Sequence, residues 1–284
     1  MQTYLAALIV GLLAGTHTAT WGMYKDAPHE GFRRYKRSVI VSTVLALLLV
    51  TVVTRDWLSA GGLVLLFGVV YACERGTTEF YKMFIRNEDQ SKYFIPMQFH
   101  VFGKVIPPGR LRVAIAAGHA VVFAAAGWAV YLAGNAGLDV PRWVLFALLG
   151  SIGGWLTAFG GAFKDAPIEG FEWLKFFRSP VIAGLWAVLL SRFTGSYLLA
   201  AIGGAGFAVA TIETYKTFFF PNRPRGKFAG KPVTHPEHLR TRQRFVPLYA
   251  GIWLVVLVSL ALGYMEPWRD GKLTPTPPAP TAQR

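Results

Sequence analysis

The sequence predicts an all-α polytopic integral membrane protein, with about eight transmembrane helices arranged as two parallel four-helix repeats. Hydrophobic residues make up 53% of the chain and charged residues only 15%. Several apolar runs reach roughly the twenty residues that cross the core of a bilayer. In addition, the octapeptide Lys-Asp-Ala-Pro-x-Glu-Gly-Phe occurs twice, beginning at Lys25 and at Lys164, each time after a glycine-rich apolar stretch. The chain is therefore interpreted as an internal duplication.

A second shared motif extends the duplication over most of the chain. Thr77-x-Glu79-x-Tyr81-Lys82 in the first half corresponds to Thr211-x-Glu213-x-Tyr215-Lys216 in the second half. We interpret residues 1–134 and 135–265 as the two repeats. The proline-rich segment 266–284 is expected to be a disordered tail.

Apolar runs bounded by charged residues mark each expected span. The sixth run is short, and Ser191-Arg192 separates it from the seventh, so seven spans remain an alternative. In order, the expected spans are Thr3 to Tyr24, Ser38 to Thr54, Gly61 to Phe84, Leu111 to Gly134, Arg142 to Phe163, Pro180 to Phe193, Ser196 to Phe220 and Phe245 to Tyr264.

Lysine and arginine crowd the loops that follow the odd-numbered spans, as at Lys36, Arg37, Arg240 and Arg242. By the positive-inside rule these loops are cytoplasmic and both termini lie outside, for which a bacterial inner membrane is the expected location. Four spans in each repeat give the two halves the same orientation, so both octapeptides face the cytoplasm. The net charge of +14 is attributed to contacts with the anionic headgroups of membrane lipids and not to nucleic acid. The sequence identifies no protein partner.

The octapeptides carry the first candidate site residues. The proline is expected in the first turn of a new short helix, with the aspartate as its cap and the glycine as its terminator. Asp26 with Glu30, and Asp165 with Glu169, would then lie on one face and hold a divalent cation, Mg²⁺ or Mn²⁺, while Lys25 and Lys164 contact phosphate. The alternative is an interfacial turn whose charges only cap the helix and reach toward water.

The second motif adds the remaining candidate residues. Glu79 with Lys82, and Glu213 with Lys216, are three residues apart, so each pair is either an ion pair within one helix or part of a site with the octapeptide of its own half. Tyr81 and Tyr215 would complete the substrate-binding side chains. Each half would then have carboxylates, lysines and a tyrosine, which is typical of a site for metal and phosphate.

Other polar residues within the spans have no counterpart in the other half. Glu74 and Arg75 correspond to Ala208 and Val209, so any role is asymmetric, either as a buried ion pair or as a substrate contact.

The spans also contain two histidines and a row of small residues. His17 and His119 lie at similar depths and permit a bis-histidine haem, but single histidines within spans more often bond a neighbouring helix, so haem is not expected. Gly11 and Gly15, like their counterparts in span five, form small-residue faces that are expected to pack spans one and five together or to line a lipid-tail groove.

The loop after span three mixes aromatic residues such as Phe94, Phe99 and Phe102 with lysine and histidine. This pattern is typical of a segment at the membrane surface, which either covers the site as a lid or rests, partly ordered, on the headgroups.

The sequence contains no P-loop, dinucleotide fingerprint, nucleophile elbow or zinc-ligand spacing. The first hypothesis is a cytoplasmic-face site that binds a phosphorylated lipid or polyisoprenoid with a divalent cation, for group transfer or phosphate-ester cleavage. The catalytic residues would be Asp26, Glu30, Glu79, Asp165, Glu169 and Glu213. The second hypothesis is a transporter or lipid flippase built from two parallel repeats, and the third is a non-catalytic membrane assembly factor. Whether the protein is an enzyme stays open.

Overall fold

The computed structural model describes residues 1–31, 35–91, 93–220, 228 and 230–267; the side chain of Glu169 is also outside the described part. The expected tail beyond residue 267 lies outside the described residues. Apart from loops and turns, the described chain consists of helices and one antiparallel pair of two-residue strands, β1 and β2, with His100 opposite Val105. The elements are α1 (Gln2–Glu30), α2 (Tyr35–Val52), α3 (Ala60–Phe80), the π-helix η1 (Tyr81–Ile85), β1 (His100–Val101), β2 (Lys104–Val105), α4 (Arg110–Gly134), α5 (Arg142–Glu169), α6 (Trp173–Leu190), α7 (Tyr197–Phe218), α8 (Glu237–Thr241), the 3-10 helix η2 (Arg242–Phe245) and α9 (Val246–Met265).

The chain is an all-α membrane protein. Seven of its described helices are long and apolar enough to cross a bilayer: α1, α2, α4, α5, α6, α7 and the continuous helix from Glu237 to Met265. The sixth expected span is long enough to cross a bilayer, because α6 begins at Trp173, before the expected start at Pro180, and continues through that proline.

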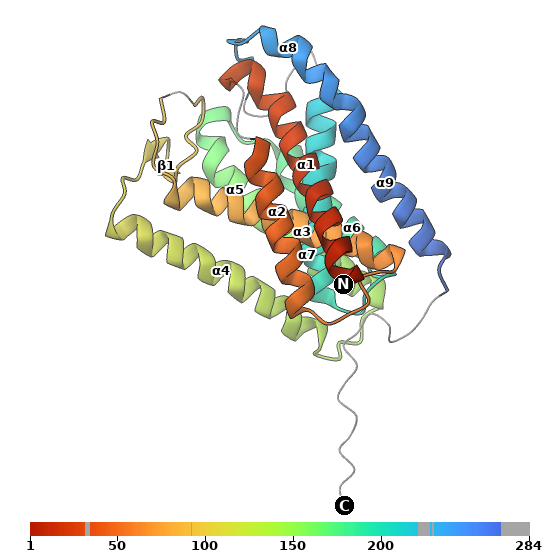
Figure 1. Cartoon of the computed structure of the whole chain (residues 1–284). Coiled ribbons are helices and arrows are strands. Elements are labelled where there is room, and N and C mark those ends of the chain that lie inside the picture. Colours follow the sequence, from red (N-terminus) through yellow and green to blue (C-terminus); the bar gives the residue numbers. More distant parts are fainter. Residues whose placement is uncertain (32–34, 92, 221–227, 229, 268–284) are drawn as a thin grey trace, which may run out of the picture.

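Helix α3 corresponds to the third expected span but is not among these seven. It contains the ionisable residues Glu74 and Arg75, and more than half of its residues are buried as it packs against α1, α2, α7 and α9. In Figure 1 it runs behind α1 and α2. Its buried residues Leu65, Leu66 and Val70 belong to the main hydrophobic core. A helix surrounded by other helices can carry polar groups that a lipid-facing helix cannot.

The two halves of the chain meet where α3 crosses α7. A Cβ atom on Gly206 would lie 1.9 Å from the carbonyl oxygen of Gly68, and a Cβ on Gly68 would lie 2.7 Å from the ring of Phe207. Only glycine permits so close an approach of two helix backbones. This crossing brings the ends of α3 and α7 together.

The small-residue faces of α1 and α5 pack differently from the expectation. A Cβ on Gly15 would lie 2.5 Å from Val39 Cα in α2, and a Cβ on Gly154 would lie 2.4 Å from Pro180 Cα in α6. Each face therefore packs on the next helix of its own half. The expectation that these faces join spans one and five is wrong, because the short connection between consecutive antiparallel helices brings α2 and α6 to them first.

The octapeptides also differ from the expectation. Helices α1 and α5 continue through them, with Pro28 and Pro167 inside the last turn, so no new helix starts there. Proline cannot donate the hydrogen bond that the carbonyl of Tyr24 would receive, and the guanidinium of Arg242 donates to this oxygen instead, at 3.1 Å. The glycines do end the helices as expected: Gly31 has φ 79° and Gly170 has φ 87°.

Candidate functional site

The octapeptide of the first half contacts the second motif of the other half. The ammonium of Lys25, near the end of α1, lies 2.9 Å from Glu213 Oε2 in α7. Lys216, one turn after Glu213, lies 2.6 Å from its other oxygen, Oε1. The three side chains are largely buried. For Lys25, the expectation of a site within its own half is therefore wrong, because the crossing of α3 and α7 places α7 beside the end of α1.

The corresponding glutamate of the first half has different partners. Glu79 pairs with Arg75 and Lys82, both on its own helical segment. The ion pair expected within one helix is thus confirmed in both halves, as Glu79 with Lys82 and as Glu213 with Lys216. Each of these two glutamates therefore pairs with two cationic side chains.

Arg75 breaks the symmetry between the two halves. By analogy with Lys25, Lys164 of the second octapeptide would pair with Glu79, and it is close enough for its charge to act on that carboxylate. Arg75, whose counterpart is Val209, pairs with Glu79 instead. The ammonium of Lys164 donates only to the thioether of Met97, at 4.0 Å, within the described part of the chain. A thioether is a weak acceptor, so Lys164 retains most of its capacity to bind an anion.

The indole of Trp21 connects the two charged groups. The ammonium of Lys25 lies 4.5 Å from its ring centre and the guanidinium carbon of Arg75 lies 5.2 Å from it. Its N–H donates to the hydroxyl of Tyr71 at 2.7 Å, which fixes the ring. Cations favour the face of an indole ring, so Trp21 holds both cations near each other despite their repulsion. The two expected half-sites are thus one composite cluster.

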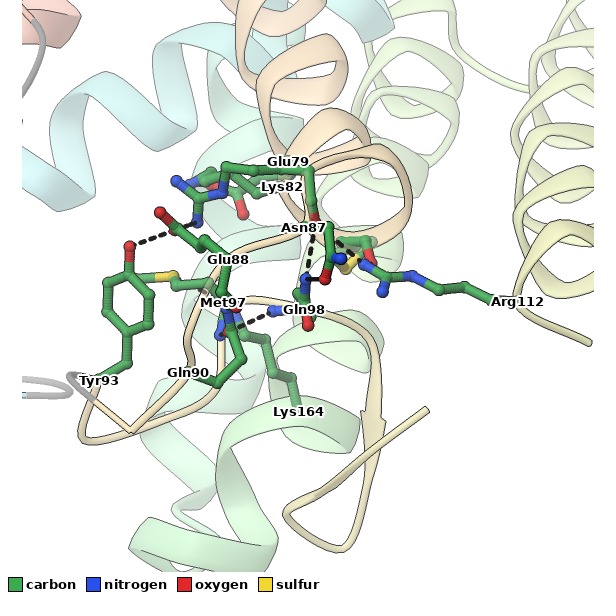
Figure 2. A network of polar contacts seen from close by, with 12 residues as sticks. Glu79, Lys82, Asn87, Glu88, Gln90, Tyr93, Met97, Gln98, Arg112 and Lys164 are labelled. Carbon is green, nitrogen blue, oxygen red and sulfur yellow. Dashed lines mark hydrogen bonds and ion pairs between the residues drawn. The ribbon is translucent and has the colours of Figure 1, made fainter. Parts of the chain in front are cut away.

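The segment between η1 and α4 forms an ordered cover over this cluster. Figure 2 shows Met97 beside Lys164 and the surrounding loop, in which the side-chain oxygen of Gln90 accepts from the N–H groups of Met97 (2.8 Å) and Gln98 (3.0 Å). Arg112 at the start of α4 donates to the carbonyl of Met83 at 2.6 Å and ties the cover to that helix. The described part of this loop is ordered and contacts Lys164 through Met97. Its expected role as a lid and its expected contact with headgroups both stay predictions, and Lys92 lies outside the described residues.

His100 at the base of the cover is a buried donor. Its Nδ1 receives the N–H of Gly103 at 3.2 Å, so the neutral ring carries its proton on Nε2. This Nε2 is buried and has no partner among the described residues. Burial, and next the positive charge of Lys164, lower the pKa of His100. The imidazole is therefore a neutral donor near the ammonium of Lys164.

The remaining expected residues are at the rim of the cluster or apart from it. Asp26 is close enough to act on Lys25, and Asp165 acts on His100. Tyr81 and Tyr215 are exposed. Glu30 ends α1, and Glu169 ends α5. In the described part of the chain, three or more metal-ligating side chains gather only at His235, Glu237 and His238, in the segment before α9.

His17, His119 and Glu74, the other polar residues expected within the spans, each contact different neighbours. Nδ1 of His17 lies 3.1 Å from the hydroxyl of Tyr71, and its ring stacks on Tyr249, so it bonds a neighbouring helix. His119 contacts a different aromatic group, which includes Phe123. Glu74 is fully buried; one carboxylate oxygen accepts from the hydroxyl of Thr78 at 2.8 Å, and the other has no partner among the described residues.

Sequence reasoning missed Trp21, Met97 and His100 as parts of the cluster, and it missed the pairing across the halves. In the sequence, the presence of Arg75 in the first half where the second half has Val209 indicated that the two halves differ. In comparisons with known proteins, no family model matches the chain, no curated protein is similar to it in sequence, and no solved structure is similar to it in fold.

Proposed function

We propose that this protein binds a phosphate-bearing lipid, such as a phospholipid or a polyisoprenoid phosphate, at the composite cluster. The observation that carries the proposal is Lys164, a partly buried ammonium near Glu79 whose expected partner is taken by Arg75. The positive charges of Lys82, Arg75 and Lys164 all act on the carboxylate of Glu79. The Nε2–H of His100 adds a neutral donor. A phosphate group accepts from ammonium, guanidinium and imidazole donors alike.

The location of the cluster favours a lipid over a soluble anion. The cations come from the ends of helices that cross the membrane, and phosphate headgroups lie at that level of a bilayer. We infer eight spans, with α3 as the enclosed eighth, in two parallel repeats. Matching helix ends support the repeats: Ser59 and Ser196 cap α3 and α7 with their side chains, as Gly31 and Gly170 end α1 and α5. From the basic loops and the positive-inside rule we infer that the cluster lies on the cytoplasmic side of a bacterial inner membrane.

A divalent cation is the second part of the proposal. Glu79 and Glu213 pair with lysine and arginine. The proposed ligands for Mg²⁺ or Mn²⁺ are Asp26 with Glu30, and Asp165 with Glu169, because each octapeptide carries one such pair of carboxylates. Mg²⁺ is commonly bound by one or two carboxylates together with substrate phosphates, which fits these pairs. Bound there, the ion would polarise the phosphate for transferase or phosphate-ester chemistry. The residues of the chain would orient the headgroup: Lys164 and His100 by donating to its oxygens, and the cover by excluding water.

The cation part has its own test. Asp26→Asn and Asp165→Asn should remove the stabilisation of the purified protein by Mg²⁺ or Mn²⁺, because they remove a charged ligand. Melting curves with and without the metals measure this. An unchanged metal response in both variants would leave the octapeptides as helix ends and would remove the metal from the proposal.

Transport is a second candidate function, favoured by polar groups within the membrane. Glu74 and His17 are both buried, and each has one polar atom without a partner among the described residues. Buried ionisable groups at that depth are typical of substrate or proton paths. Movement of labelled lipid between the leaflets of proteoliposomes distinguishes transport from binding alone.

Lipid binding itself is tested by a matched pair of variants. Native mass spectrometry of the purified protein with phosphatidic acid, and with a polyprenyl phosphate, should show Lys164→Gln binding about tenfold to a hundredfold more weakly. This is the value of one charge-assisted hydrogen bond of about 1.5–3 kcal/mol. Lys25→Gln, at the equivalent position but paired with Glu213, should bind nearly as well as the original protein. Equal binding by both variants, or equal binding of phosphatidic acid and a neutral diacylglycerol, would contradict the proposal.

A further inference from the structure

The segment His235-Pro236-Glu237-His238 brings three metal-ligating side chains together beside the C-terminal end of α1. Nδ1 of His235 lies 3.3 Å from Glu237 Oε1, and Nε2 of His238 lies 3.7 Å from the same oxygen. All three ligand atoms lie within 4.8 Å of one another. The proposed lipid site uses none of these residues.

These separations fit one small ion. Ligand atoms bound about 2.0–2.2 Å from a tetrahedral zinc ion lie about 3.3–3.6 Å from one another. The two separations from Glu237, 3.3 and 3.7 Å, are close to this range, so an ion would need only small rotations of the side chains. Two histidines and one glutamate are also a ligand set found in zinc sites with an open fourth position.

The backbone holds these ligands in place by bonding to the first octapeptide. The N–H groups of Thr234 and His235 both donate to the carbonyl of Pro28, at 3.0 and 2.9 Å. The hydroxyl of Thr234 donates to the carbonyl of His29 at 2.7 Å. Figure 1 shows α8, which carries Glu237 and His238, beside the end of α1.

The end of α1 leaves room for the first ligand. A Cβ on Gly31 would lie 3.4 Å from Nε2 of His235, so the ring rests against a residue that has no side chain. Nδ1 of the same ring points to Glu237. The backbone of His235 is therefore held by Pro28, and one edge of its ring rests against Gly31. Its other ring nitrogen, Nδ1, lies on the side of Glu237 and His238.

We propose that His235, Glu237 and His238 bind a Zn²⁺ ion that fastens the segment before α9 to the end of α1. Two imidazoles favour Zn²⁺ and related transition metals, whereas Mg²⁺ and Mn²⁺ prefer oxygen ligands. The site is therefore different in metal and in place from the carboxylate pairs of the octapeptides. Because three protein ligands leave one position open, water or an anion completes the coordination.

The test measures zinc binding by the full chain in nanodiscs, after removal of any histidine tag, by equilibrium dialysis at pH 7.5 with metal analysis. One Zn²⁺ should bind per chain. His235→Gln and His238→Gln should each weaken binding by at least about a hundredfold, because changes even in the outer shell of zinc sites cost about 10- to 100-fold. His119→Gln, a histidine in α4, is the matched control and should bind like the original protein.

Two further measurements separate the possible outcomes. Melting temperatures without zinc show whether His235→Gln and His238→Gln are folded; if either is not, Glu237→Gln replaces it, since that side chain is exposed. Bound Co²⁺ should give the intense visible absorption of a tetrahedral site with nitrogen and oxygen ligands. Zinc binding that is weak and not saturable, or that the variants leave unchanged, would overturn the proposal. The result is independent of lipid binding by Lys164.

Discussion

Arg75 makes the two halves of the molecule chemically different at a single position. It pairs with Glu79 in the first half, whereas its counterpart Val209 is apolar, and Glu213 is free to pair with Lys25. The consequence is local: each glutamate has two cationic partners, and the ammonium of Lys164 is left with a thioether as its acceptor within the described part of the chain, so it can accept a ligand.

Replacing Arg75 by its counterpart should therefore restore the symmetry and remove the lipid site. In Arg75→Val, Glu79 is expected to pair with Lys164, and the binding of phosphatidic acid should fall about tenfold, the value of one charge-assisted bond. Native mass spectrometry measures the change. The double variant with Lys164→Gln should bind no more weakly than Lys164→Gln alone, because both changes act through the same ammonium. Additive losses would contradict this account.

Glu79 and Glu213 should differ in their contributions to stability. The side chain of Glu213 is 12% exposed and that of Glu79 is 36% exposed. Removing one partner of a buried ion pair costs about 3–5 kcal/mol, whereas exposed pairs are worth about 0–1 kcal/mol. Glu213→Gln should therefore lower the free energy of unfolding more than Glu79→Gln does.

Denaturation in mixed micelles measures both variants, with Glu172→Gln at an exposed position as a control that should change stability by less than about 0.5 kcal/mol. If Glu79→Gln proves the more harmful change, Glu79 and not Glu213 is the central carboxylate.

At the scale of helices, close packing within each half depends on single glycines. Gly15 and Gly22 lie on the same helix, but a Cβ on Gly15 would lie 2.5 Å from Val39 Cα, and a Cβ on Gly22 would meet nothing within 4 Å. Gly15→Ala should thus cost about 1–3 kcal/mol by forcing α1 and α2 apart. Gly22→Ala should be neutral or stabilise by up to about 1 kcal/mol through helix propensity. Thermal unfolding of both variants, measured side by side, checks the contrast; similar melting temperatures would show that α2 is free to move.

The positions of most helices could be predicted from the sequence, but the contacts between residues far apart in the chain could not. Apolar runs located the spans because each depends only on neighbouring residues. The course of α1 through Pro28 was missed because the carbonyl that proline leaves unbonded is satisfied by Arg242, 218 residues along the chain from Tyr24. Likewise, spacing predicted the pair of Glu213 with Lys216 on one helix, but nothing in the spacing shows that Lys25 of the other half joins them.

For the whole molecule, the basic segments after α1, α3, α5 and α7 should all lie on one side of the membrane. With Cys73 replaced by serine, Asp89→Cys and Thr241→Cys should be protected from an impermeant thiol reagent added to intact cells, and Asp139→Cys between α4 and α5 should react. Gel-shift labelling before and after permeabilisation reads out all three. Labelling of Asp89→Cys and Thr241→Cys from outside would reverse the orientation, and opposite results for the two would exclude parallel repeats.

The pairing of Lys25 with Glu213 also has a consequence for biosynthesis. The two residues are 188 positions apart, so at about 5–20 residues per second the ribosome needs roughly 10–40 seconds to make the glutamate after the lysine. During that time α1 is already made while α7 does not yet exist. The nascent first half therefore carries an ammonium whose final counter-ion has not been synthesised, and the composite cluster can assemble only in the last stage of translation.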